Sequence, residues 1–185
     1  MNIGSAVASG LHGALLLARG RAEGVRYVEA DMAGAARSFW AIAICLPAFV
    51  CLRVLAWAAA GQPPHLAHSF MLDLLAFVIG WCGFAVVSYR VVGAMGLAER
   101  WPRAIALWNW CQVVQYLLLV VSSIPGLLGA PVLLDQAAQL VGIGWALWLE
   151  WFAFRLTLGI GVIAAVGLVA LDVAIGAVLA GVTVG

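Results

Sequence analysis

The chain has 185 residues, of which 66% are hydrophobic and only 9% are charged, with a formal net charge of +1, whereas an ordinary soluble domain carries about 25% charged residues. A water-soluble fold of this length could not bury so much apolar surface, so the composition predicts a single membrane unit. All nine basic residues are arginine and lysine is absent, which excludes chemistry that depends on a lysine amine.

The first apolar segment, residues 5–19, predicts a short helix. Its apolar side chains recur at helical spacing, at Val7, Leu11, Leu15 and Ala18. The arginines follow this run, whereas a secretory signal peptide, the competing interpretation, needs its positive stretch before the apolar core. We therefore expect residues 1–37 to be a cytoplasmic segment whose amphipathic helix lies in the membrane interface.

Five further apolar stretches follow, and each is long enough to cross a bilayer. Prolines and glycines in the turns at residues 61–64 and 129–131 end the helices before them. Arg155 interrupts the apolar run before the last stretch, so we place a tight connection there. The chain is predicted to be all-α: residues 38–185 form a polytopic bundle of five transmembrane helices, with spans at about 38–60, 69–91, 104–124, 132–154 and 158–183.

The arginines predict the orientation of the bundle, because positively charged loops stay in the cytoplasm. With the N-terminus inside, every arginine except Arg53 falls on the cytoplasmic side or at its boundary, and the opposite loops, residues 61–68 and 125–131, contain none. This arrangement places the C-terminus outside. We expect an integral membrane protein, located in the bacterial inner membrane.

Three charged residues inside the predicted spans reach a similar depth in the outer half of the bilayer: Arg53, Asp73 and Asp172. A charge in hydrocarbon is costly unless it is paired or hydrated. We therefore expect an Arg53–Asp73 or an Arg53–Asp172 pair. Three roles stay open for these residues, namely a structural salt bridge between helices, a proton or ion relay, and snorkelling to the outer surface.

A second polar group lies on the third and fourth spans and consists of Asn109, Gln112, Gln115 and Glu150. Interhelical hydrogen bonding accounts for it, since amides commonly hold membrane helices together. The alternative is that these side chains line a polar cavity. The surrounding tryptophans are interpreted as interface anchors and packing residues rather than as a ligand cage: Trp108, Trp110, Trp145, Trp148 and Trp151.

The sequence contains no recognisable catalytic or cofactor motif. A Walker-type loop, H-E-x-x-H and G-x-S-x-G are all missing, so phosphate transfer, zinc proteolysis and the usual serine hydrolysis have no support. His65 and His68 supply only two metal ligands, and the four cysteines lack metal-binding spacing. The basic residues follow the membrane boundary, so no nucleic-acid partner is expected. We therefore expect a non-enzymatic protein without a cofactor. Of the function classes considered, an intramembrane enzyme has the least support.

Three short segments carry a family resemblance: Arg37-Ser38-Phe39-Trp40 entering the first span, Ala106-Leu107-Trp108-Asn109-Trp110 opening the third, and Glu150-Trp151-Phe152 closing the fourth. With five spans and short loops, the chain resembles the Yip1-like integral membrane proteins, particularly small bacterial members, from about residue 19 onward. The resemblance implies a five-span fold and no catalytic residues. Eukaryotic relatives of this family are associated with membrane trafficking and shaping.

Two functions from different classes fit these features. The first is a non-enzymatic accessory or membrane-organising subunit, which contacts other membrane proteins or copies of itself through small residues of the last span: Gly159, Gly161, Gly167, Gly176, Ala180 and Gly181. The alternative is a small-solute or ion transporter or channel that uses the intramembrane polar residues. Five spans lack the internal duplication usual in secondary carriers, which favours the first function.

Overall fold

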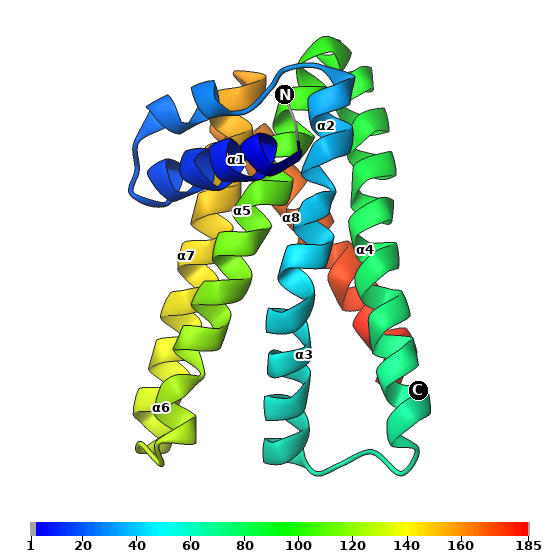
Figure 1. Ribbon diagram of the computed structural model, residues 1–185, viewed down its shortest axis with the longest axis vertical. Coiled ribbons are helices and arrows are strands. Elements are labelled where there is room, and N and C mark those ends of the chain that lie inside the picture. The colour runs from blue at the N-terminus through cyan, green and yellow to red at the C-terminus, as the bar shows by residue number, and fades with distance from the viewer. Residues whose placement is uncertain (1–2, 185) are drawn as a thin grey trace.

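The computed structural model describes residues 3–184, and within that range it contains helices and no strand (Figure 1). Five helices are long and apolar enough to cross a membrane, and a shorter apolar helix precedes them, as predicted. Residues 1, 2 and 185 of the two predicted segments lie outside the described residues. The protein is therefore an integral membrane helix bundle.

The spans begin or end several residues away from the predicted boundaries. The N-terminal segment consists of α1 (Ile3–Ala18) and the 3-10 helix η1 (Ala22–Tyr27). The first span begins with α2 (Met32–Ser38) and continues as α3 (Trp40–Ala60), and the second is α4 (Leu66–Ala94). The third is α5 (Trp101–Ser122), between the short helices η2 (Ala98–Arg100) and α6 (Ile124–Leu127), and the last two are α7 (Val132–Leu158) and α8 (Val162–Val184).

The connection between the last two spans lies later than the sequence predicted. Arg155 belongs to α7, which ends at Gly159 in a left-handed conformation with φ 66°. An arginine fits in the last turn because it interacts favourably with the helix dipole, and its guanidinium carbon lies 5.0 Å from the centre of the Trp151 ring. Arg100 donates a hydrogen bond to the Leu158 carbonyl at 2.7 Å, so η2 and the α7–α8 connection meet at one end of the bundle.

We call this end, which also holds α1 and η1, the arginine end, and the opposite end the far end. The central helix is α5, which packs against α1, α2, α3 and α7. Its residues 104–111 are all buried. The other spans expose many large apolar side chains, as expected for helices that face lipid. The core of the molecule therefore surrounds the arginine half of α5.

The N-terminal helix α1 lies across the arginine end, against α5 (Figure 1). Of its predicted apolar positions Leu15 is 44% exposed, and Gly10 and Gly13 are buried. A Cβ atom at position 10 would overlap the Trp110 indole. Small residues therefore let α1 approach α5 closely. The Leu15 side chain is exposed on the outer surface of the bundle, as expected for a helix in the membrane interface.

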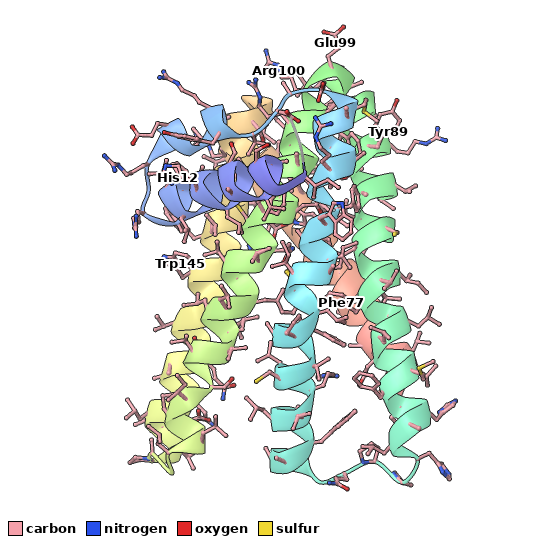
Figure 2. The ribbon with its side chains drawn as sticks, in the orientation of Figure 1. His12, Phe77, Tyr89, Glu99, Arg100 and Trp145 are labelled. Carbon is pink, nitrogen blue, oxygen red and sulfur yellow. The ribbon has the colours of Figure 1, made fainter. Side chains whose placement is uncertain are left out.

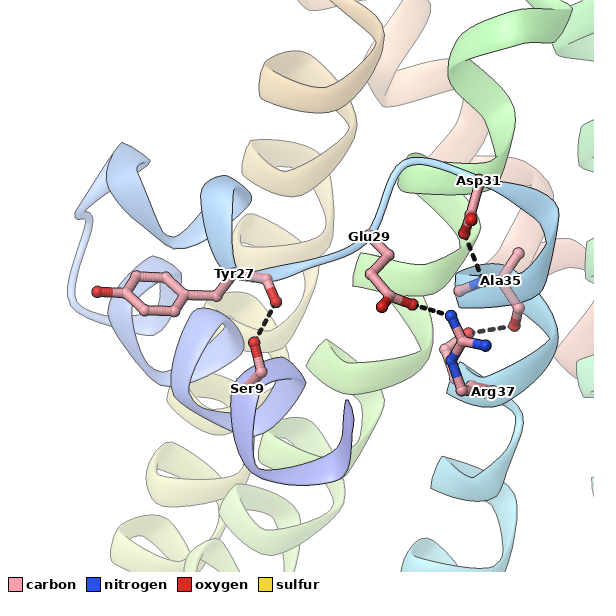
Figure 3. Close-up of polar contacts among 8 residues, drawn as sticks. Ser9, Tyr27, Glu29, Asp31, Ala35 and Arg37 are labelled. Atoms are coloured by element: carbon pink, nitrogen blue, oxygen red, sulfur yellow. Dashed lines mark hydrogen bonds and ion pairs between the residues drawn. The ribbon is translucent and has the colours of Figure 1, made fainter. Parts of the chain in front are cut away.

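Polar contacts fasten the segment between α1 and the first span (Figure 3). The Ser9 hydroxyl donates a hydrogen bond to the Tyr27 carbonyl, and Arg37 forms an ion pair with Glu29. The Asp31 carboxylate caps α2 by accepting a hydrogen bond from a backbone N–H in its first turn at 2.7 Å. These contacts tie Tyr27 to α1 and Glu29 to α2.

Toward the far end the helices separate, and the loop after α3 crosses a wide space to reach α4 (Figure 1). Two cavities lie in this half of the molecule. One lies between α3, α4, α5 and α8, and the other lies between α3 and the region of α6 and α7. The bundle is therefore closely packed at the arginine end and open at the far end.

Candidate functional site

The cavity between α3, α4, α5 and α8 gathers most of the polar residues that the sequence singled out. Its volume is about 340 Å³, near the small end of the range of about 300–1,000 Å³ for ligand pockets. Its polar and aromatic lining consists of Phe49, Arg53, Asp73, Phe77, Trp81, Trp108, Gln112, Tyr116 and Asp172. Glycine, alanine and aliphatic side chains of α4 and α8 complete the wall.

An ion pair lies on the wall formed by α3 and α4. The Arg53 guanidinium donates to the Asp73 carboxylate at 3.2 Å, so the expected Arg53–Asp73 pair is confirmed. The Asp73 side chain is 11% exposed and that of Arg53 is 38% exposed. Because the two charges cancel, this pair contributes polarity to the cavity without a net charge.

Of the two other candidate carboxyl groups, Asp172 of α8 lines the cavity together with Trp108 and Gln112, whereas Glu150 is not part of the lining. The Trp108 indole donates to Glu150, at 3.2 Å, and Glu150 is 2% exposed. Within residues 3–184 neither has an arginine in salt-bridge contact.

A chain of aromatic rings forms one wall of the cavity. Ring centres lie 4.5 Å apart for Phe49 and Phe77, 5.8 Å apart for Phe77 and Tyr116, and 5.2 Å apart for Trp81 and Trp108. Phe77 extends from α4 toward α3 (Figure 2). The sequence analysis did not select Phe77, Trp81 or Tyr116. A signal was present on α4, where Asp73, Phe77 and Trp81 follow one another at intervals of four and share one helix face.

The three amides of α5 have two different roles. Gln112 lines the cavity, as the alternative interpretation expected. Asn109 instead donates to the Ser38 hydroxyl at 2.7 Å, and Gln115 donates to the Ala146 carbonyl at 3.1 Å. For these two, interhelical hydrogen bonding is confirmed. The two predicted polar groups are therefore partly merged, because Gln112 joins the charged residues while Asn109 and Gln115 do not.

The remaining candidate ligands stay apart. His65 and His68 are exposed near the start of α4, and the described residues contain no group of three or more metal-binding side chains. Cys45, Cys51 and Cys82 are free, as is Cys111. Within residues 3–184 these side chains therefore do not form a metal-binding cluster at the cavity.

Comparisons with known proteins add no further identification. No protein-family model matches the chain, and searches of the curated proteins and of the solved structures found no match either. The fold establishes an integral membrane protein, and a cavity lined by apolar, aromatic and a few charged or polar side chains lies between four of its helices.

Proposed function

We propose that this protein binds a small solute or ion in the cavity and passes it across the membrane, as a non-enzymatic transporter or channel. One observation carries the proposal: Arg53, Asp73, Gln112 and Asp172, from four different helices, converge on a single cavity. Polar groups that only join helices need no open space beside them. Asn109 is a direct example, since it is fully buried against Ser38.

The cost of charges in a membrane supports this proposal. An ionisable residue inside a membrane span is a candidate for a solute or ion pathway when it faces a cavity. The cavity offers guanidinium, carboxyl and amide groups together with aromatic rings, which are groups that bind and orient a solute. Because a single copy has five spans, an alternating-access carrier would require two copies, whereas a channel would require one or more.

The proposed location is the bacterial inner membrane, with the arginine end in the cytoplasm and the C-terminus outside. The support is the positive-inside rule, because all arginines except Arg53 lie outside the far half of the bundle. A reporter fused after Gly96, in the connection between α4 and η2, tests the orientation. A cytoplasmic signal agrees with it, and a signal from outside the cell contradicts it.

Electrical recording on liposomes that contain the full chain tests the transport function. Rapid exchange to K⁺, Na⁺, choline or a different pH is expected to produce a protein-dependent current for at least one condition. Asp172→Asn is expected to lower this current by about tenfold, since it removes a charge from the pathway. Asp135→Asn is the matched control, because Asp135 is also an aspartate within a span but lines the other cavity. Absence of any current, or equal currents in the two variants, contradicts the proposal.

We also propose a second candidate, an accessory or membrane-organising subunit of the Yip1-like type. The observation that favours it is an exposed small-residue face on α8, opposite the cavity-lining face, formed by Gly167, Ala170, Ala174 and Gly181. Such faces allow a neighbouring helix to approach closely. Light scattering of the purified protein and capture of membrane partners test this candidate. A strictly monomeric protein that captures no membrane partner contradicts it.

A further inference from the structure

We infer that the ligand of the cavity is an organic ammonium cation, a compact quaternary or tertiary amine carrying one positive charge. This inference rests on the proposed function, since it names the class of solute that the same cavity takes. Two features of the cavity carry it: the Asp172 carboxyl group, which has no arginine in salt-bridge contact among the described residues, and the aromatic rings of the lining.

The first feature is an unbalanced negative charge. Arg53 and Asp73 neutralise each other, and within residues 3–184 no arginine lies in salt-bridge contact with Asp172. An ionised Asp172 therefore places an unbalanced negative charge on the cavity wall. A buried charge without a partner is strongly unfavourable. A cation in the adjacent cavity would supply the missing partner, whereas a neutral or anionic solute would not.

The second feature identifies the kind of cation. Rings of Phe77, Trp81 and Tyr116 line the cavity together with that of Trp108. Aromatic faces attract organic cations, and the attraction is greatest where water is excluded. An ammonium group with alkyl substituents is bound favourably by both features, because its alkyl surface packs on the rings while its charge faces the Asp172 carboxyl group.

Inorganic cations fit the cavity less well. Magnesium and calcium require six or more oxygen ligands in a defined geometry, and the described residues show no cluster of carboxylates and imidazoles that could hold a metal. The lining is predominantly aromatic and aliphatic. A small hard cation would therefore exchange its hydration shell for too few oxygens.

Calorimetric binding to the purified full chain tests the inference with two ligands of nearly equal shape. Choline carries a quaternary ammonium, and 3,3-dimethylbutan-1-ol replaces its nitrogen with carbon and is neutral. We expect choline to bind more tightly than the alcohol by about tenfold or more, because only the cation gains the electrostatic and ring contacts. This comparison uses the natural chain and therefore does not depend on the folding of a variant.

Two variants locate the binding. Asp172→Asn removes the charge, and Trp81→Leu removes one ring and keeps an apolar side chain. Each is expected to weaken choline binding by about tenfold, while Asp135→Asn binds like the natural chain. Loss of affinity in the Asp135 variant equal to that in the Asp172 variant would overturn the assignment to this cavity.

The outcomes separate this inference from the proposed function. Preferential binding of choline without any current supports the ligand class and contradicts transport. A current carried by K⁺, Na⁺ or protons, together with equal binding of choline and the alcohol, supports transport and overturns the ammonium inference. Failure of both ligands to bind also overturns it.

Discussion

The arginine end and the far end of the bundle are built from the same helices but packed differently. At the arginine end α5 is enclosed by α1, α2, α3 and α7, and Ile105 and Leu107 are buried there. Toward the far end the same spans separate around a cavity, and Leu117 of α5 is 57% exposed. Close packing in one half can therefore fix the positions of the helices, while their other halves hold polar groups around an open space.

Two leucines on α5 provide the strongest test of this comparison. Leu107→Ala should lower the free energy of unfolding by about 2–5 kcal/mol, because Leu107 is fully buried and its truncation leaves a cavity. Leu117→Ala should cost less than about 1 kcal/mol, since Leu117 is exposed toward the far end. Thermal unfolding in one detergent measures both, and equal losses would show that the two halves are packed alike.

The contact between α1 and α5 gives a second, smaller effect. Gly10→Ala places a methyl group against the Trp110 indole and should destabilise the docking of α1 by about 1–3 kcal/mol. Trypsin should then cleave faster after Arg19 and Arg21. Gly93→Ala on α4 is the matched control, because a Cβ there meets nothing within 4 Å. Unchanged cleavage in the Gly10 variant would mean that α1 is not held by this contact.

The ion pair of the open half should have the smallest effect. A double-mutant cycle with Arg53→Gln and Asp73→Asn should give a coupling energy of about 0.6 kcal/mol, the average for polar contacts between membrane helices. The partial exposure of Arg53 keeps this value low. A coupling as large as the loss from Leu107→Ala would contradict the view that stability resides mainly at the arginine end.

Depth in the membrane was predictable from the sequence, whereas the lateral arrangement of the helices was not. Arg53 and Asp73 were matched correctly because both positions can be counted from the turn between their spans. Counting also placed Asp172 at that level, but no count along one helix indicates which neighbour it faces. That it shares a cavity with Trp108 and Gln112 depends on how α8 packs against the other helices.

Local chemistry explains why the end of α7 was misplaced and why two packing residues of α1 were missed. Arg155 was interpreted as a break between two helices because a charge interrupts an apolar run. A long arginine side chain near a helix end can, however, reach the membrane–water boundary while its helix continues. On α1 the apolar spacing correctly predicted a helix. The contribution of Gly10 and Gly13 to its packing was not predicted, because these glycines act through their lack of a side chain, which hydrophobic periodicity does not register.

Water access to the cavity in a membrane tests the central claim most directly. In a chain whose four cysteines are replaced, Ala76→Cys and Gly176→Cys introduce thiols on the cavity wall, and Val166→Cys introduces one on an exposed face of α8. A charged, membrane-impermeant thiol reagent should label the two cavity positions about tenfold faster than Val166→Cys, because it reacts only where water reaches. If the thiols at the two cavity positions are labelled no faster than the thiol of Val166→Cys, the result would contradict a water-accessible cavity between the helices.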